Sequence, residues 1–203
     1  MSADSKTDLL RKIRDDVVAL KDSPLYEFRV AENNLPVIGE GSHDASIIFI
    51  GEGPGFNEAR QGRPFCGAAG KVLDKLLAAA GIPRESVYIT NILKDRPPNN
   101  RDPLPEEIVV YGPFLDRQIE IIQPKVIATL GRYAMAYIMR KYGLESVMQP
   151  ISAAHGKTYH ADTLFGIIDI IPLYHPAVAV YNASTLKTLE EDFQILKKYH
   201  TAQ

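Results

Sequence analysis

Four largely apolar runs, separated by stretches with helical spacing, are the feature that most constrains how this chain can fold. The apolar runs occupy residues 47–51, 87–90, 125–130 and 166–173. Helical spacing of apolar residues is found at 70–80, 105–122, 133–142 and 186–196. Strands that are apolar on both faces are typical of parallel sheets, and strand–helix alternation places helices on both faces of such a sheet. The pattern predicts an α/β fold. A mixed sheet with one antiparallel edge near 156–161 is the alternative.

The N-terminal part is expected to pack on this sheet. Apolar residues at helical spacing predict a first helix at 9–20. Residues 22–45 are rich in proline, asparagine and glycine, which predicts a long lead-in loop. Pro113 lies inside the 105–122 pattern, where a kink or a restart of the helix is expected. We expect residues 1–203 to form one domain, with 1–44 as an N-terminal helix and lead-in loop packed on it.

Composition narrows the class of protein. The 203 residues are 45% hydrophobic and 24% charged, which is typical of a soluble globular domain. No apolar run approaches the roughly 20 residues that span a bilayer, and the first residues lack the apolar segment of a secretory signal. The single cysteine, Cys66, excludes an internal disulfide and indicates a reducing cytoplasm. Because the net charge is −2, any nucleic-acid site must be a local basic patch.

Polar residues follow the predicted strands at the edge where open parallel sheets bind ligands. Glu52 follows the first strand, and Asn91 follows the second. The third strand leads into Gly131 and Arg132, and the fourth leads into His175. A carboxylate, an amide and an imidazole are therefore expected to meet in one crevice.

Several common motifs are absent from the sequence. The segment GEGPGF is not a dinucleotide-binding GxGxxG, and GAAGKV lacks the first glycine and the hydroxyl residue of a P-loop. The five histidines show no metal-binding spacing, and there is no GxSxG nucleophile motif. These absences argue against hydride transfer, P-loop chemistry and zinc-dependent hydrolysis, and against a flavodoxin-like nucleotide-binding enzyme.

Four segments in order along the chain resemble the uracil-DNA glycosylases of family 4. They are GEGPGFNEARQGRPFCGAAGKVLDKLL (51–77), YITNILKDRPPNNRDPLPEE (88–107), PKVIATLG (124–131) and YHPAV (174–178). The resemblance covers about residue 45 to the end. It implies a three-layer α/β/α sandwich around a central four-stranded, mainly parallel sheet. It also implies a DNA repair hydrolase that flips uracil out of DNA and cleaves its bond to deoxyribose.

The resemblance assigns roles to the residues at the strand ends. His175 would donate a hydrogen bond to the 2-carbonyl of the departing uracil, and Asn91 would read the imide N–H and the 4-carbonyl. Phe65 would stack on the flipped base, and Glu52 with Gly53 would wall the pocket, holding water or excluding the methyl group of thymine. The family also places a second glutamate and a later asparagine at the catalytic site. Glu58 and Asn100 match those positions, although a surface role is equally open for both.

DNA contacts follow from the resemblance as well. The residues expected to contact DNA are Lys94, Arg96, Arg101, Gly67, Val180 and Tyr181. The basic side chains would meet phosphates, although a solvated loop is the alternative. Gly67 would offer backbone N–H groups at a helix start, although close packing of helix on sheet is the alternative. The segment after the His-Pro pair is where the family inserts a wedge into the duplex.

The chain departs from the family at the iron–sulfur cluster. The family holds a 4Fe–4S cluster on four cysteines, and those positions are Leu20, Ser23, Asp95 and Tyr111 here. None can supply a thiolate, so we predict a member without cofactor or metal. Apolar packing of Leu20 with Tyr111, and hydrogen bonds from Ser23 and Asp95, would then hold the N-terminal segment.

Three functions remain open at this stage. The first is a monofunctional uracil-DNA glycosylase that acts as a cytoplasmic monomer, nucleoid-associated in a prokaryote, with uracil-containing DNA as its partner. The second is the same fold with a preference for hypoxanthine or xanthine. The third is a non-catalytic DNA-binding or polymerase-accessory protein, although four pocket residues together argue against it.

Overall fold

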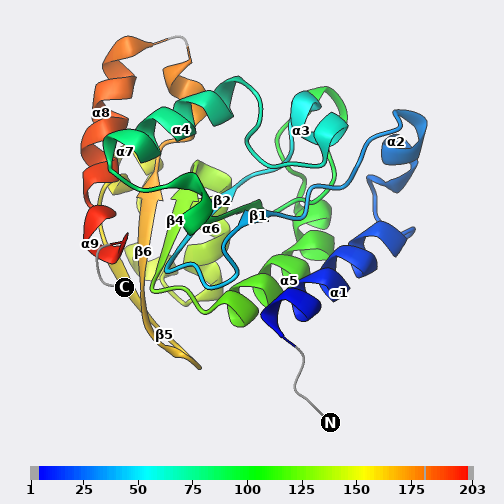
Figure 1. Ribbon diagram of the computed structural model, residues 1–203, viewed down its shortest axis with the longest axis horizontal. Helices are drawn as coiled ribbons and strands as arrows, with labels where there is room; N and C mark the ends of the chain where they lie inside the picture. Colours follow the sequence, from blue (N-terminus) through cyan, green and yellow to red (C-terminus); the bar gives the residue numbers. More distant parts are fainter. Residues whose placement is uncertain (1–4, 181, 201–203) are drawn as a thin grey trace.

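The computed structural model describes residues 5–180 and 182–200, which form an α/β fold around a six-stranded sheet (Figure 1). The strand order is β1-β3-β2-β4-β6-β5. The four inner strands run parallel and are β2 (Ile47–Gly51), β3 (Tyr88–Asn91), β4 (Val126–Leu130) and β6 (Gly166–Leu173). These are the four predicted strands, so the α/β prediction is confirmed.

Two antiparallel strands extend the sheet at its edges. At one edge, β1 (Glu40–Gly41) pairs with β3. At the other edge, β5 (Tyr159–Thr163) pairs with β6. The alternative of a mixed sheet is therefore confirmed at β5. The edge at β1 is not expected from the sequence, because two residues are too few to show any hydrophobic periodicity.

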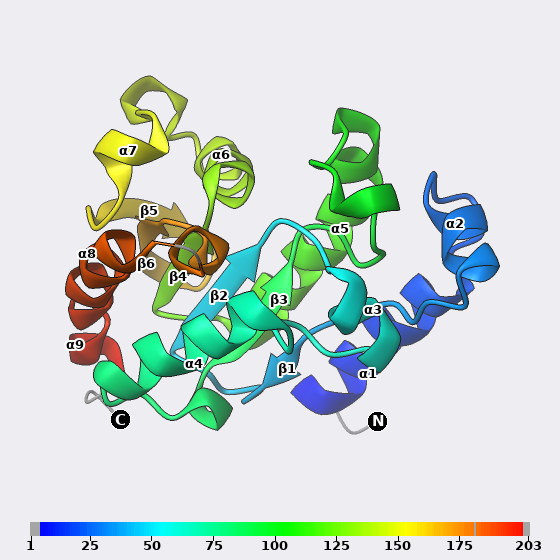
Figure 2. The same cartoon turned by 90° about the horizontal axis from the view of Figure 1, so that it is seen from above.

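Helices cover both faces of the sheet, which gives the three-layer sandwich (Figure 2). One face carries α1 (Lys6–Ala19), α5 (Pro105–Ile122) and α6 (Arg132–Lys141). The other carries α4 (Ala68–Ala79) and α8 (Ala183–Gln194), followed by the short α9 (Lys197–His200). Along β2, Ile48 and Ile50 enter the first core, and Ile47 and Phe49 enter the second. This alternation explains why β2 is apolar at every position and the other inner strands are apolar at most positions.

Four short helices were not expected among the described residues, namely α2 (Tyr26–Ala31), α3 (Phe56–Gln61), α7 (Ile151–Ala154) and α9. The lead-in segment 22–45 is therefore not simply a loop, because it holds α2 and β1. Short 3-10 turns lie at Arg84–Ser86, Pro98–Asn100, Glu145–Val147 and Pro176–Ala179. Helices of four to six residues depend on tertiary packing more than on their own sequence, so periodicity misses them.

Pro113 neither ends nor restarts α5, which runs as one helix from Pro105 to Ile122. The predicted restart is therefore wrong. The carbonyl of Val109 loses its helical donor at this position, but Val109 lies on an exposed turn where water can solvate it. None of the helices in the described ranges is long and apolar enough to cross a bilayer.

Candidate active site

A small cavity lies at the carboxyl ends of β2, β3 and β6. Its volume is about 80 Å³, and it is lined by Gly53, Gly55, Glu58, Phe65, Ala69, Asn91 and His175. The expectation that an amide and an imidazole meet at this edge of the sheet is confirmed. The carboxylate that joins them is Glu58, whereas Glu52 lies beside the cavity and does not line it.

Asn91 is the last residue of β3 and presents a buried amide to the cavity. The residue is 1% exposed, and its Oδ1 has no hydrogen-bond partner among the described residues. Gly51 lies opposite Asn91 in the pairing of β2 with β3. Gly51 leaves room for the amide, because a Cβ at this position would lie 2.4 Å from Oδ1 of Asn91. An unpaired buried acceptor costs about 1–3 kcal/mol. A ligand that donates to Oδ1 would recover this energy.

Phe65 forms an aromatic wall of the cavity in a strained backbone conformation. Its φ is +48°, a region that an aromatic residue seldom adopts. Gly70 packs so closely on this turn that a Cβ there would lie 1.8 Å from the carbonyl oxygen of Phe65. The ring centroid lies 5.6 Å from that of His175. The protein thus holds this ring beside the imidazole at a local cost of about 1–3 kcal/mol.

The imidazole of His175 is neutral and has a defined tautomer. The backbone N–H of Ala177 donates to Nδ1 at 3.2 Å, so the ring proton of the neutral form lies on Nε2. Burial lowers the pKa of His175 to about 4, and the charge of Glu58 only partly opposes this. At neutral pH the residue is therefore an uncharged N–H donor through Nε2.

Glu58 organises the loop that carries Phe65. Its Oε1 accepts from the backbone N–H groups of Cys66, at 3.0 Å, and of Gly67, at 2.8 Å, which caps the start of α4. The Gly67 N–H is therefore already engaged, which contradicts the predicted phosphate contact at Gly67. The carboxylate holds the turn and also borders the cavity.

Glu52 lies between the cavity and α6. A Cβ on Gly131 would lie 2.5 Å from Oε1 of Glu52 and 3.4 Å from Cβ of His175, so the two residues are neighbours. Burial raises the pKa of Glu52, the charge of Asp102 acts in the same direction, and the Tyr133 backbone N–H opposes them. Gly131, which the sequence placed directly after the third strand, has φ of +93° and is thus a residue of the site.

Lys94 is the clearest wrong prediction, because its side chain is fully buried. Its Nζ donates to the backbone oxygen of Asn91 at 2.7 Å, to Gln118 Oε1 at 2.6 Å and to Thr90 Oγ1 at 2.8 Å. Burial lowers its pKa well below the usual value. Lys94 cannot reach a phosphate here. It supports the strand end that carries Asn91.

Two other predicted residues are occupied by structural contacts. Arg101 donates to both carboxylate oxygens of Glu107, at 2.9 and 2.5 Å, beside the start of α5. Asn100 is exposed, and its Oδ1 accepts from Nε of Arg96 at 2.6 Å. The structure therefore does not bring Asn100 to the cavity.

Arg96, also predicted to contact DNA, lies half-buried on the loop after β3, and the last two predicted DNA contacts, Val180 and Tyr181, lie on the segment after His175. Val180 is half-buried at the end of the turn Pro176–Ala179, whereas Val178 on the same turn is 43% exposed. Tyr181 lies outside the described residues.

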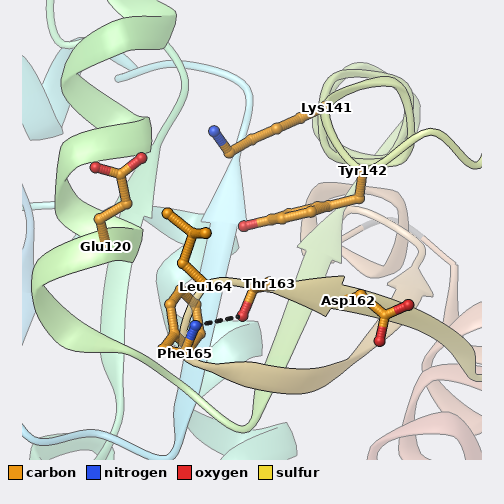
Figure 3. Close-up of a pocket in the computed structure, with 7 residues that line it drawn as sticks. All are labelled: Glu120, Lys141, Tyr142, Asp162, Thr163, Leu164 and Phe165. Carbon is orange, nitrogen blue, oxygen red and sulfur yellow. Dashed lines mark hydrogen bonds between the residues drawn. The ribbon is translucent and has the colours of Figure 1, made fainter.

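A larger hollow lies at the opposite end of β6, where the β5–β6 hairpin turns (Figure 3). Its volume is about 450 Å³, and it is lined by Glu120, Lys141, Tyr142, Asp162, Thr163, Leu164 and Phe165. Lys141 already pairs with Asp116 at 3.0 Å, and Leu164 is fully exposed. None of the described residues that line this hollow was predicted to belong to the site, and the hollow lies away from the carboxyl ends of the strands.

The sheet, the strand-end cavity and the sequence together define the class of protein. The chain belongs to the uracil DNA glycosylase superfamily, whose sequence model matches residues 38–197. It is 46% identical to the type-4 uracil-DNA glycosylase of Sulfurisphaera tokodaii, over 94% of this chain and 84% of that protein. It is 45% identical to the type-4 enzyme of Saccharolobus solfataricus, over 94% and 86% of the two chains. A type-5 uracil-DNA glycosylase of Pyrobaculum aerophilum is 26% identical over 80% of this chain. The resemblance to the family-4 enzymes is thus supported along most of the chain.

Proposed function

We propose that this protein removes uracil from DNA by hydrolysing the N-glycosidic bond and leaving an abasic site. The observation that carries the proposal is the buried Oδ1 of Asn91, which has no partner within the described part of the chain and shares a cavity with Phe65 and His175. The type-4 names of the similar proteins support the same activity.

Asn91 selects the base in this proposal. Its Oδ1 accepts from the imide N–H of uracil, and its Nδ2 donates to the 4-carbonyl. Cytosine presents an acceptor and a donor at these two positions, so binding cytosine would leave buried polar groups unpaired. A site that reads by hydrogen bonds can discriminate by about 10⁴–10⁵. The contact of Lys94 with the Asn91 backbone oxygen fixes the strand end from which the amide projects.

Phe65 and His175 act on the flipped base from neighbouring sides. The Phe65 ring stacks on the base, and such stacking contributes about 1–3 kcal/mol. The Nε2–H of His175 donates to the 2-carbonyl, where negative charge grows as the glycosidic bond breaks. A neutral donor suits this task, because it is already in place before the charge develops. Among the residues that the structure describes, no lysine lines the cavity, which favours a monofunctional hydrolase.

We propose that Glu52 binds and activates the water molecule that attacks the sugar. Its carboxyl lies against Gly131 beside His175, outside the space that the base would fill. A carboxylate there can accept the proton of water while a cationic sugar develops. Glu58 keeps the Phe65 loop in position through Cys66 and Gly67, so its contribution is to hold the site rather than to react.

We further propose that this family member works without an iron–sulfur cluster. The four positions that the resemblance assigns to cluster ligands are Leu20, Ser23, Asp95 and Tyr111, and none is a thiol. The described residues hold no group of three or more histidine, cysteine or acidic side chains suited to a metal ion. These residues do not fit the cluster, so no step of the reaction involves it.

A buried polar chain joins the segments that a cluster would join. The Tyr111 hydroxyl donates to Asp95 Oδ2 at 2.6 Å and lies in hydrogen-bond contact with Ser23 Oγ. Arg29 donates to Asp95 at 3.1 Å and to the carbonyl oxygens of Val17 and Val18, both at 3.0 Å. These hydrogen bonds connect the end of α1 to α5 and to the loop after β3. We name it the Arg29–Asp95–Tyr111–Ser23 network.

The activity is tested on an oligonucleotide with one uracil, followed by alkaline cleavage of abasic sites. We expect cleavage with uracil and none with hypoxanthine or xanthine at the same position. Asn91→Asp should raise activity on cytosine relative to uracil or abolish both. An unchanged preference would remove Asn91 from base reading. Cleavage at hypoxanthine would favour the shifted specificity, and DNA binding without any cleavage would favour a non-catalytic role.

The cofactor, compartment and oligomeric state need separate measurements. Purified protein should lack the visible absorbance of an iron–sulfur cluster and contain no stoichiometric iron, and stoichiometric iron would contradict the proposal. We propose that residues 1–203 act as one domain and as a cytoplasmic monomer. The single cysteine supports the reducing compartment. Light scattering of the purified protein gives its oligomeric state.

A further inference from the structure

An exposed aromatic ring stands at the rim of the base cavity. Phe56 is the first residue of α3, and its side chain is 48% exposed. It follows Gly55, which caps this helix and lines the cavity. A large ring is thus open to solvent one residue away from the space where a base would bind.

Two arginines surround this ring. The guanidinium carbon of Arg60, one turn further along α3, lies 5.3 Å from the Phe56 centroid. The guanidinium carbon of Arg96, on the loop after β3, lies 5.2 Å from the same centroid and 5.9 Å from that of Phe28. Such contacts are cation–π interactions. Segments about forty residues apart in sequence therefore build one cationic aromatic surface, which we call the Phe56 surface and define as Phe56, Arg60 and Arg96.

The positive charge of this surface is not neutralised by carboxylates. Arg60 donates to the backbone oxygen of Glu32 at 2.8 Å, and Arg96 donates to the amide of Asn100. Neither forms an ion pair with any residue that the structure describes. Other arginines do pair with acids, for example Arg63 with Glu40 at 2.6 Å and Arg117 with Asp16 at 2.7 Å. Two cations without an ion pair in the described part of the chain thus lie beside an open ring, although the net charge of the protein is −2.

We propose that the Phe56 surface binds the DNA strand next to the flipped nucleotide. The guanidinium groups take the phosphates, and a neighbouring base stacks on the ring or on a guanidinium plane. Continuity with the cavity argues for this occupant, because the strand on either side of a flipped nucleotide must leave over the cavity rim. The charge is complementary to phosphate. The inference rests on the proposed function only in that the cavity takes its base from DNA.

Binding of a short fluorescein-labelled oligothymidine, measured by fluorescence anisotropy, tests this surface without any excision. Phe56→Ala should weaken binding about 5- to 160-fold, which is the range for loss of one stacked base. Arg60→Gln and Arg96→Gln should each weaken binding and reduce the slope of log K against log salt by about 0.7, which corresponds to one lost contact with single-strand phosphate.

Arg117→Gln is the matched control, because Arg117 also lies over a ring, 5.9 Å from the Phe114 centroid, but on α5. It should bind the oligothymidine as tightly as the wild type. Circular dichroism melting should show that all four variants are folded. Wild-type affinity in both Phe56→Ala and Arg60→Gln would overturn the proposal, as would an equal loss in Arg117→Gln or no binding by the wild type. Failure of the proposed function would look different: the wild type would bind this probe but excise no uracil.

Discussion

Removing the guanidinium of Arg29 should strongly destabilise the fold, and the structure gives the size of the effect. Arg29 is buried, and it is the cation beside Asp95, which is itself only 1% exposed. Arg29→Met keeps the apolar stem but leaves a buried carboxylate without its cation, and it leaves the carbonyls of Val17 and Val18 without this donor. Breaking a buried ion pair from one side costs about 3–5 kcal/mol. For a chain of this size, that corresponds to a fall in Tm of about 6–20 °C.

Urea unfolding followed by circular dichroism measures this change. Arg14→Met is the matched control, because the Arg14–Asp15 pair is exposed, with side-chain exposures of 56% and 65%. The control should change the free energy of unfolding by less than about 0.5 kcal/mol. The double variant Arg29→Met with Asp95→Leu should be more stable than Arg29→Met alone, because it no longer buries an unpaired charge. If Arg29→Met and Arg14→Met lose the same stability, the reasoning about this network is refuted.

Three further predictions concern the site. His175→Ala should lower the single-turnover rate of uracil excision about 10²–10³-fold if Nε2–H is the donor to the 2-carbonyl, and an unchanged rate would reassign this residue. Because the folded-state pKa of His175 is about 4, against 6.5 for the ordinary value, its contribution to stability is complete above pH 6.5 and is lost as the pH falls towards 4. The free energy of unfolding, measured by urea titration at pH 5 and pH 7, should differ less between the two pH values in His175→Gln than in the wild type. An equal difference in both proteins would contradict the lowered pKa. Lys94→Met should destabilise the fold by about 1–3 kcal/mol for each acceptor that it leaves unpaired, yet the salt dependence of DNA binding should not change. A reduced salt slope in Lys94→Met would restore the phosphate contact that burial excludes.

The architecture and the central pair of site residues were predictable from the sequence. Runs that are apolar at most positions favour burial on both faces, so the four inner strands of a parallel sheet could be predicted from hydrophobicity. Parallel strands bring their carboxyl ends to one edge, so Asn91 and His175 were expected at the same edge of the sheet. The cavity contains both, together with Phe65.

The tertiary structure decided which charged groups are buried, paired or free. Lys94 and Arg96 are two residues apart in one loop, but Gln118 and Thr90 surround the first while the second reaches an exposed ring. Glu58 rather than Glu52 borders the cavity, because the backbone N–H groups of the α4 start draw its carboxylate there. The local sequence shows how apolar a segment is, and this was enough to predict the strands. The environment of a single charge depends on the distant segments that pack around it, and only the folded chain brings those segments together.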